Sequence, residues 1–284
     1  MNRLKKSIQS TIGVVYEIIV WDNIHEKKGL CEVYNRLAQN AKFDIICFLH
    51  EDIIFETKDW GKSLCDKYMD NADLGVIGVA GSKYKSRVYS GWYTGLKEFD
   101  CANIKHQYPD RFEHIYLSPS SKGILIEDVV CVDGVFISCR KSVWEEIRFN
   151  ENEIPGFHFY DIDFSVRASK AWKVSVTYDI NIVHFTLGGD FGENWVNTAF
   201  LYHNMVNKEL PFTKLDNLAV SPELRIAKTW LDVLKNYKIS LRSKYRWIKD
   251  QRLLNKPVLW YGILKFLFYY PLNLRFIHKS FRKQ

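Results

Sequence analysis

Acidic and histidine side chains directly follow two short, largely apolar runs near the start of the sequence. Asp22 follows the first run, and His50, Glu51 and Asp52 follow the second. In open α/β sheets, ligands bind outside the carboxyl ends of the strands. Hard divalent cations such as Mg²⁺ and Mn²⁺ take oxygen ligands, often one or two carboxylates together with diphosphate oxygens. The second group therefore predicts a cation site, whereas Asp22 alone could equally cap the helix that follows.

A second acidic stretch contains Asp161 and Asp163. Two residues apart in a helix means about 200°, so these side chains cannot share a helical face. They fit a loop-to-helix junction at which one carboxylate caps the helix and the other is free. The alternative is that both complement the helix dipole in the first turn. His184, after an apolar pair and before Gly188, is a candidate metal ligand, although a lone histidine after a strand is more often structural.

These side chains need elements that position them, and the first two-thirds of the sequence alternates strand-like and helical patterns. Strands are predicted at residues 17–21, 45–49, 76–80, 129–132, 135–139 and 174–178. Helical patterns cover residues 33–41, 60–69 and 164–172, and continue from 193 to about 236. The stretch 82–128 is predicted to form loops over one edge. This alternation predicts an α/β fold with a mostly parallel, two-sided sheet.

Composition indicates a globular chain that stays inside the cell. The 284 residues are 47% hydrophobic and 26% charged, which is typical of a folded protein and not of a disordered one. No apolar run reaches the roughly 18 residues that span a bilayer. The basic start lacks a small-residue cleavage site, so export is not expected. The six cysteines show no CxxC spacing and are interpreted as reduced, buried thiols of a cytosolic protein.

The net charge of +7 is unevenly distributed. Residues 235–284 contain 13 Lys and Arg and one acid, Asp250, which gives +12 and leaves −5 for residues 1–234. Within this tail, 258–270 is rich in aromatic residues and carries one charge. Such a segment is typical of contact with an anionic membrane surface, with each nearby basic residue adding about 1 kcal/mol. The alternative is a packed helix pair with a solvated basic face. Nucleic acid is not an expected partner, because no nucleic-acid-binding motif is present.

Five segments of the sequence form a recognisable set: Tyr16–Asn23, Gly29–Asn35, Phe48–Trp60, Val132–Phe136 and Gly156–Phe164. Together, and in this order, they resemble the streptomycin-biosynthesis StrF-like branch of the family 2 glycosyltransferases. The resemblance implies a GT-A fold, an α/β sandwich that binds nucleotide-diphosphosugars, over residues 1–205, with 206–284 as a basic helical extension. Relatives begin with a further strand of the nucleotide pocket, whereas this chain begins at about the next helix. Either the true start lies upstream, or the donor site lacks that strand and is weakened.

The resemblance also implies roles for individual residues. Asp161 matches the catalytic carboxylate, and Asp163 and Arg167 continue its motif. His50 replaces the first Asp of the metal-binding Asp-x-Asp motif. The implied donor and metal site, with Mn²⁺ or Mg²⁺, comprises Asp22, Glu51, Asp52, His50 and His184. The acceptor-side candidates are Trp92, Tyr93, His158, Tyr160 and Asp163; the aromatic rings among them could stack on sugars or simply pack in the core.

The implied reaction is transfer of a hexosyl group from a nucleotide-diphosphate sugar to a hydroxyl of a surface glycan or lipid-linked acceptor. One base and no protein nucleophile predict a single displacement with inversion. The tail from about residue 235 would hold the enzyme peripherally on the inner face of the plasma membrane. One alternative is a weak or inactive nucleotide-sugar-binding partner in a polysaccharide assembly complex. Another is a structural adaptor at the membrane surface that has no nucleotide affinity.

Overall fold

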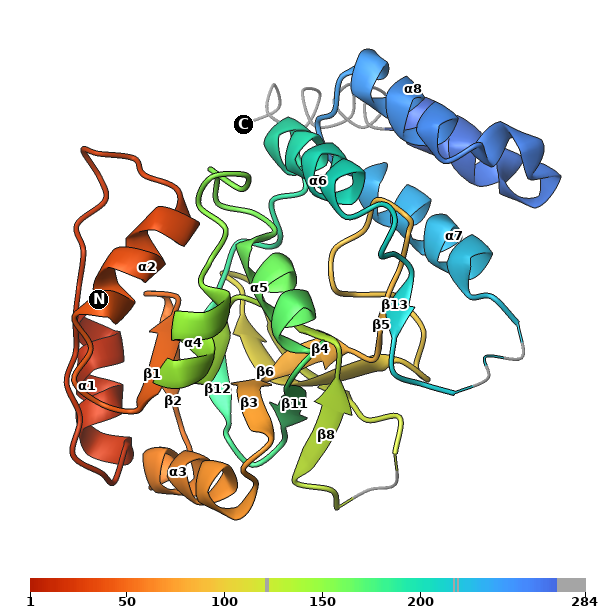
Figure 1. Cartoon of the computed structure of the whole chain (residues 1–284). Coiled ribbons are helices and arrows are strands. Elements are labelled where there is room, and N and C mark those ends of the chain that lie inside the picture. The colour runs from red at the N-terminus through yellow and green to blue at the C-terminus, as the bar shows by residue number, and fades with distance from the viewer. Residues whose placement is uncertain (121–122, 217, 219, 270–284) are drawn as a thin grey trace. The chain divides into compact units, whose positions relative to one another are not determined.

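The computed structural model describes residues 1–120, 123–216, 218 and 220–269, which divide into two units (Figure 1). The first unit consists of residues 1–85, 91–188 and 211–216. The second unit consists of residues 86–90 and 189–210 and the chain after 216. This division differs from the predicted boundary at residue 205, because helix α6 (Glu193–Met205) belongs to the second unit.

The first unit contains a five-stranded sheet in the order β1, β10, β3, β11, β8. These strands are β1 (Ile45–Leu49), β10 (Phe136–Arg140), β3 (Leu74–Gly78), β11 (Lys173–Thr177) and β8 (Ile126–Val129). Of these neighbours, β3 and β11 pair in parallel and the others pair antiparallel. The prediction of a mostly parallel sheet is therefore wrong. Strand β10 lies between β1 and β3 and pairs antiparallel with both. Strands β1 and β3 are therefore not adjacent parallel strands joined by a crossover, as the alternating pattern suggested.

A second, six-stranded sheet has the order β2, β12, β6, β4, β9, with β7 paired to β6. Its strands are β2 (Ile53–Phe55), β12 (Ile182–Phe185), β6 (Asp100–Gln107), β4 (Ala80–Ser82), β9 (Cys131–Val132) and β7 (Phe112–Leu117). A short pair joins β5 (Tyr84–Lys85) to β13 (Phe212–Thr213). The prediction of loops over 82–128 is wrong, because this stretch contains the β6–β7 hairpin. Strand β7 is largely exposed, so it has no apolar face for the sequence pattern to reveal.

Five helices complete the first unit: α1 (Asn2–Thr11), α2 (Leu30–Gln39), α3 (Trp60–Asp70), α4 (Lys141–Ile147) and α5 (Tyr160–Ala168). The helices predicted near 33–41 and 60–69 are confirmed, and the third begins earlier than its predicted start at 164. The strand predicted at 17–21 is wrong. This segment joins no sheet in the part of the chain that the structure describes, and its apolar side chains stay partly exposed. An apolar run becomes a strand only where a neighbour completes its hydrogen bonds.

An aromatic cluster fixes the start of α3 beneath the second sheet. Phe55 stacks on Trp60 with ring centroids 4.0 Å apart, and Phe136 meets both rings edge-on. Leu4 and Ile8 of α1 are buried in the same core. Rings packed in this way contribute about 0.5–1.5 kcal/mol per pair beyond their buried area. Strands β1 and β2, which flank residues 50–52, therefore pack against this hydrophobic core.

The second unit is helical. After α6 it contains α7 (Glu223–Leu234), α8 (Leu241–Asp250) and two short 3₁₀ turns, η1 (Leu253–Asn255) and η2 (Pro257–Leu259), followed by helical residues 260–269. Trp195 stacks on Trp230 at 4.9 Å, and Phe191 packs edge-on against both. A helical character was predicted for this part of the chain, and residues 270–284 of the predicted extension lie outside the described residues.

Among the described residues, no helix combines the length and apolar character that crossing a bilayer requires. All six cysteines lie within the described ranges and are free thiols, as predicted. Burial raises the pKa of the Cys31, Cys47, Cys101 and Cys131 thiols to about 12, so they stay protonated at neutral pH.

Candidate active site

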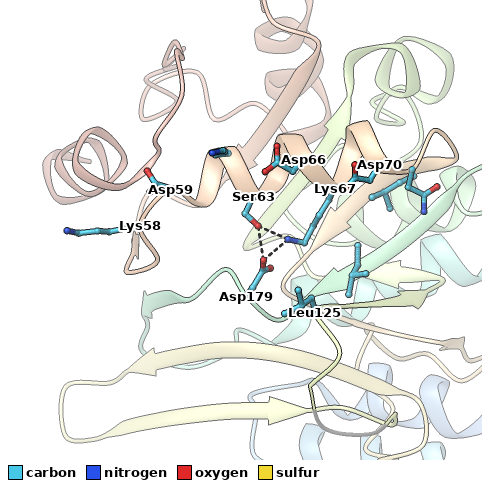
Figure 2. A pocket seen from close by; sticks show the side chains of 12 residues that line it. Lys58, Asp59, Ser63, Asp66, Lys67, Asp70, Leu125 and Asp179 are labelled. Atoms are coloured by element: carbon cyan, nitrogen blue, oxygen red, sulfur yellow. Dashed lines mark hydrogen bonds and ion pairs between the residues drawn. The ribbon is translucent and has the colours of Figure 1, made fainter.

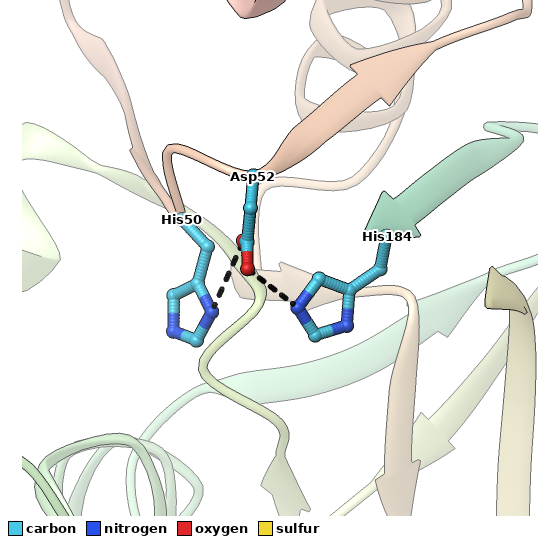
Figure 3. Close-up of side chains that lie close together, drawn as sticks. All are labelled: His50, Asp52 and His184. Carbon is cyan, nitrogen blue, oxygen red and sulfur yellow. Dashed lines mark ion pairs between the residues drawn. The ribbon is translucent and has the colours of Figure 1, made fainter. Parts of the chain in front are cut away.

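Three side chains predicted to bind a cation lie together in the first unit (Figure 3). His50 directly follows β1, Asp52 directly precedes β2, and His184 lies on β12. Strand β12 runs antiparallel to β2 with His184 opposite Ile53, and the Phe185 N–H donates to the Asp52 carbonyl at 2.8 Å. This register brings His184 beside Asp52 although the two are far apart in the sequence.

The geometry of this cluster fits a bound cation. Asp52 Oδ2 lies 3.3 Å from His184 Nε2, and Asp52 Oδ1 lies 4.0 Å from His50 Nδ1. One ligand atom from each residue lies within 4.8 Å of the others. Figure 3 shows the Asp52 carboxylate between the two imidazole rings. Nδ1 of His184 is buried and has no hydrogen-bond partner among the described residues.

The charge states in the cluster suit metal binding. Burial lowers the pKa of His50 although Asp133 and Asp52 oppose it, so its imidazole is neutral and keeps a lone pair for a metal. Burial alone would raise the pKa of Asp52. The hydrogen bond from His184 and the charges of His184 and His50 outweigh this effect of burial, so the pKa of Asp52 is lowered. The cluster therefore offers the Asp52 carboxylate and the neutral imidazole of His50 at neutral pH.

Asp161 lies in the first turn of α5. Its Oδ2 accepts a hydrogen bond from the Gly134 N–H at 2.9 Å. Burial, and then the charge of Asp133, raise the pKa of Asp161 to about 7. A general base is most effective when its pKa lies near the working pH. Asp161 is therefore suited to take a proton from a hydroxyl at neutral pH.

Tyr160 connects the cation cluster to Asp161. Its hydroxyl lies 3.0 Å from His50 Nε2, and its buried ring packs against Tyr34 and Phe149 at centroid distances of 5.6 and 6.3 Å. Only glycine fits at position 134 beside this tyrosine, because a Cβ there would lie 2.0 Å from the hydroxyl oxygen of Tyr160. Tyr160 therefore links the cation cluster to the first turn of α5, which carries Asp161.

The acceptor-side candidates are placed differently from one another. Trp92 is half-buried and its Nε1 donates to Asp133 Oδ2 at 2.6 Å. Tyr93 is 39% exposed, and its ring meets that of Trp92 edge-on at 5.7 Å. His158 is half-buried just before α5. The ring of Tyr160 is buried, so it packs in the core and is not open to stacking on a sugar.

Asp163 is buried and paired with Arg167, so it is not open to an acceptor. It is 1% exposed, and its Oδ2 accepts hydrogen bonds from Arg167 Nε and Nη2 at 2.8 and 2.7 Å. The prediction that one of the two acids caps α5 is wrong. The N-cap residue is Phe159, which has φ = 66° and no polar side-chain atom, and both acids lie in the first turn.

The remaining donor-side candidates are exposed. Asp22 Oδ1 accepts a hydrogen bond from the Ile24 N–H at 3.1 Å, which is a local turn contact. Within the described residues, Asp22 forms no hydrogen bond or ion pair with the cation cluster. Glu51 is exposed between His50 and Asp52. The structure therefore brings together Asp52, His50 and His184 and leaves these two acids at the surface.

Sequence reasoning missed three residues of the site. Asp133 accepts the Trp92 hydrogen bond, and Gly134 donates to Asp161. Both lie in the Val132–Phe136 segment, so the motif itself was a usable signal. His106 pairs with His184 across β6 and β12, with ring centroids 5.3 Å apart. It lies in the stretch predicted as loops, so the pattern carried no sign of it.

Two surface hollows lie apart from these residues. The first, of about 740 Å³, runs along α3 (Figure 2). Asp179 Oδ2 there accepts hydrogen bonds from Lys67 Nζ at 2.6 Å and Ser63 Oγ at 2.7 Å, so the charges of Asp179 and Lys67 pair with each other. The second, of about 320 Å³, lies between α2 and residues 148–152. The residues that line them include neither Asp161 nor the cation cluster.

Comparison with known proteins places the chain in a family. The sequence model of the Glycosyltransferase like family matches residues 2–209. The chain belongs to this family. The match confirms the glycosyltransferase part of the predicted resemblance, and the StrF-like branch stays a prediction. For a member of this glycosyltransferase-like family, the mixed α/β architecture with curled sheets is consistent with the predicted GT-A fold.

Solved structures give only distant likenesses to this glycosyltransferase-like chain. A197 from STIV is 13% identical with a TM-score of 0.31, over 55% of this chain and 63% of that chain. GalNAc-T7 with UDP, GalNAc and Mn²⁺ is 12% identical with a TM-score of 0.39, over 59% of this chain and 32% of that chain. This chain thus matches less than two thirds of either protein. No curated protein sequence matches it.

Proposed function

We propose that this chain is an inverting, metal-dependent glycosyltransferase that moves a hexosyl group from a nucleotide-diphosphate sugar to an acceptor hydroxyl. One observation carries the proposal. The 3.0 Å contact between Tyr160 and His50 links the His50–Asp52–His184 cluster to the helix that carries Asp161. A charge-neutralising site and a base poised near neutrality are the two parts that such a transfer needs.

On the donor side, the cluster holds the cation. Two imidazoles beside one carboxylate weigh against Mg²⁺, which prefers oxygen ligands, so Mn²⁺ is the better fit of the two predicted ions. When bound, the ion neutralises charge on the diphosphate leaving group. The exposed Asp22 and Glu51 are the proposed further contacts to the donor.

On the acceptor side, Asp161 takes the proton of the attacking hydroxyl. The Gly134 N–H fixes one of its oxygens, which orients the carboxylate. Asp133 is the nearby second carboxylate, but its oxygens accept hydrogen bonds from Val135 N–H at 2.9 Å and Trp92 Nε1 at 2.6 Å. These bonds give Asp133 a positioning role instead of a nucleophilic one, in keeping with the proposed single displacement with inversion.

The test combines nucleotide binding with transfer. Thermal unfolding is followed with UDP, GDP, CMP and dTDP, each with Mn²⁺ or EDTA, and nucleotide release is followed with the matching nucleotide sugars. We expect one nucleotide to raise the melting temperature in a Mn²⁺-dependent way. Asp161→Asn should keep that shift but lose about 10²–10⁴-fold in transfer. Asp128→Asn, whose carboxylate bonds Ser175 elsewhere in the first unit, is the matched control.

Other outcomes would reassign the protein. Nucleotide binding without transfer, unchanged in Asp161→Asn, would favour the inactive binding partner of a polysaccharide assembly complex. If no nucleotide shifts the melting temperature, with or without Mn²⁺, the glycosyltransferase proposal fails and the structural adaptor becomes the better account.

We also propose that the second unit binds an anionic membrane surface, which would bring the enzyme to a surface glycan or lipid-linked acceptor at the inner face of the plasma membrane. Helical residues 260–269 bury Ile263 and Phe266 on one side. Their other side chains and the preceding turn expose large apolar groups. These are Val258 (67%), Trp260, Tyr261 (71%), Leu264 and Phe268.

Charge supports the same surface. The stretch that begins at Lys235 carries the excess of basic residues, and on α8 the exposed ones include Arg242, Arg246 and Lys249. Aromatic side chains flanked by cations are typical of helices that lie in the membrane interface. Anionic lipid is thus the partner whose charge and chemistry match these exposed groups.

A further inference from the structure

We propose that Asp133 is a positioning residue of the active site, and that it fixes the indole of Trp92 as a platform for a carbohydrate acceptor. The inference rests on the proposed glycosyltransferase activity and names the part of the acceptor that the site would recognise, a sugar ring. It concerns a residue to which neither the sequence motifs nor the family match assigns a role.

The backbone holds Asp133 on both sides. Its N–H donates to the Ala80 carbonyl of β4 at 2.8 Å, and its Oδ1 accepts the Val135 N–H at 2.9 Å. The carboxylate therefore has a fixed direction. Its other oxygen accepts the indole N–H of Trp92 at 2.6 Å. Hydrogen bonds to an ionised acceptor are shorter and stronger than those between neutral groups, so this bond restrains the ring.

A second anchor fixes the loop that carries Trp92. The Asp100 carboxylate is 1% exposed and accepts hydrogen bonds from the backbone N–H groups of Thr94, Gly95 and Leu96 at 2.8–3.2 Å. The Thr94 hydroxyl donates to it at 2.8 Å. Trp92 thus lies between two carboxylate anchors, one that holds its indole and one that holds the turn just after it.

The anchored ring and the proposed base are held by the same stretch of backbone. Asp133 binds Trp92, and the next residue, Gly134, binds Asp161 at 2.9 Å, so consecutive residues hold the indole and the carboxylate. Trp92 is half-buried and Tyr93 is 39% exposed, so aromatic surface remains accessible there. Ligand sites commonly combine such aromatic surface with a few fixed polar groups. A sugar that packs on the indole would present a hydroxyl to Asp161.

The same unit offers a matched control. Trp172 Nε1 donates to Glu146 Oε2 at 3.1 Å, which is a tryptophan–carboxylate pair outside the site. We would compare Asp133→Ala and Trp92→Ala with Glu146→Ala and Trp172→Ala in steady-state transfer, varying donor and acceptor separately.

Removing either partner of the site pair should raise the acceptor KM about tenfold or more, with the donor KM unchanged. The effects should be less than additive in the double variant, because both act through one ring. The control pair should leave both constants at wild-type values. An equal change in donor and acceptor KM, or additive effects, would overturn the positioning role of Asp133.

A binding readout separates this inference from the proposed reaction. A glycan array is probed with the full chain in the presence of Mn²⁺ and each of UDP, GDP, CMP and dTDP in turn. We expect wild type and Asp161→Asn to bind the same oligosaccharide on the array, and Trp92→Ala to lose that binding. Binding to the array without any sugar transfer would support the role of Trp92 in carbohydrate binding and would contradict the proposed reaction. If wild type binds no oligosaccharide on the array, or Trp92→Ala binds as wild type does, the platform is refuted.

Discussion

The hydroxyl of Tyr160 lies 3.0 Å from Nε2 of His50, so a residue of helix α5 touches the imidazole at the end of strand β1. The residue after Tyr160 is the proposed base, and His50 belongs to the cation cluster. The other ring nitrogen of His50, Nδ1, faces Asp52 at 4.0 Å. A partner on one ring nitrogen orients the other toward a metal. The helix that carries the proposed base therefore also orients a proposed metal ligand.

Tyr160→Phe tests this link. The ring stays buried and keeps its packing, but the contact with His50 is lost. Loss of such a supporting contact typically weakens metal binding by about 10–100-fold. Calorimetric titration with Mn²⁺ would measure the effect. Tyr68→Phe, another buried tyrosine whose hydroxyl bonds Ser138 at 3.3 Å, should leave the affinity unchanged. Equal Mn²⁺ affinity in wild type and Tyr160→Phe would show that the contact does not orient the ligand.

The pH dependence of transfer follows from Asp161. Only the ionised carboxylate accepts a proton, and its pKa is raised to about 7, so kcat/KM should rise with pH and level off above about 7. Asp133 is the second cause of this shift, after burial. Asp133→Asn removes that negative charge, lowers the pKa of Asp161 and should move the rising limb to lower pH. A limb that stays in place or moves to higher pH would contradict this assignment, and Asp128→Asn serves as the control profile.

The pair between buried Asp163 and partly exposed Arg167 predicts a stability effect. Arg167→Met would leave a carboxylate that is 1% exposed without its cation, and breaking a buried pair in this way costs about 3–5 kcal/mol. Urea unfolding would measure the loss. Adding Asp163→Asn should restore part of it, because the unpaired charge is gone. For comparison, Arg111→Met breaks an exposed pair with Asp110, for which about 0–1 kcal/mol is expected. Equal losses in the two single variants would refute the structural role of Asp163.

Membrane binding by the second unit predicts a result in vesicle pelleting. Wild type should sediment with vesicles that contain phosphatidylglycerol and less with pure phosphatidylcholine, and salt should weaken the binding. Replacing Trp260, Tyr261, Leu264 and Phe268 by serine should release the protein. The control is Leu201→Ser with Leu224→Ser, which removes exposed apolar groups of the same unit outside 258–269. If the fourfold variant sediments as wild type does, this segment is not the binding surface.

The sequence was most informative where local pattern and tertiary structure agree. The continuous apolar run 45–49 is strand β1, and the polar residues after it lie at the predicted edge. The run 17–21, which is apolar from Ile18 onward, is not a strand, because strand formation depends on a hydrogen-bonding neighbour that local composition does not report. Hairpin β6–β7 shows the reverse case. Its two strands pair over six residues, but β7 is largely exposed, so its sequence has no apolar pattern that would predict a strand.

The site shows the same limit at the level of single residues. His184 and Asp52 are candidates from residue type alone, but their 3.3 Å contact depends on the register between β2 and β12. Asp133 lies in the Val132–Phe136 motif, but the motif does not show which residue Asp133 contacts. The role proposed for it depends on a hydrogen bond to Trp92, a residue of a distant loop, and that contact exists only in the folded chain.

The pairing of β12 has a consequence for how the cation site can be used. This strand is clamped by β2 on one side and by β6 on the other, and a shift of one residue would turn His184 to the opposite face. Mn²⁺ binding at the proposed site would therefore report whether three segments from distant parts of the chain have assembled in the correct order and alignment. A spectroscopic metal signal could follow refolding of this sheet without any substrate, and it would distinguish a misregistered sheet from a correctly closed one.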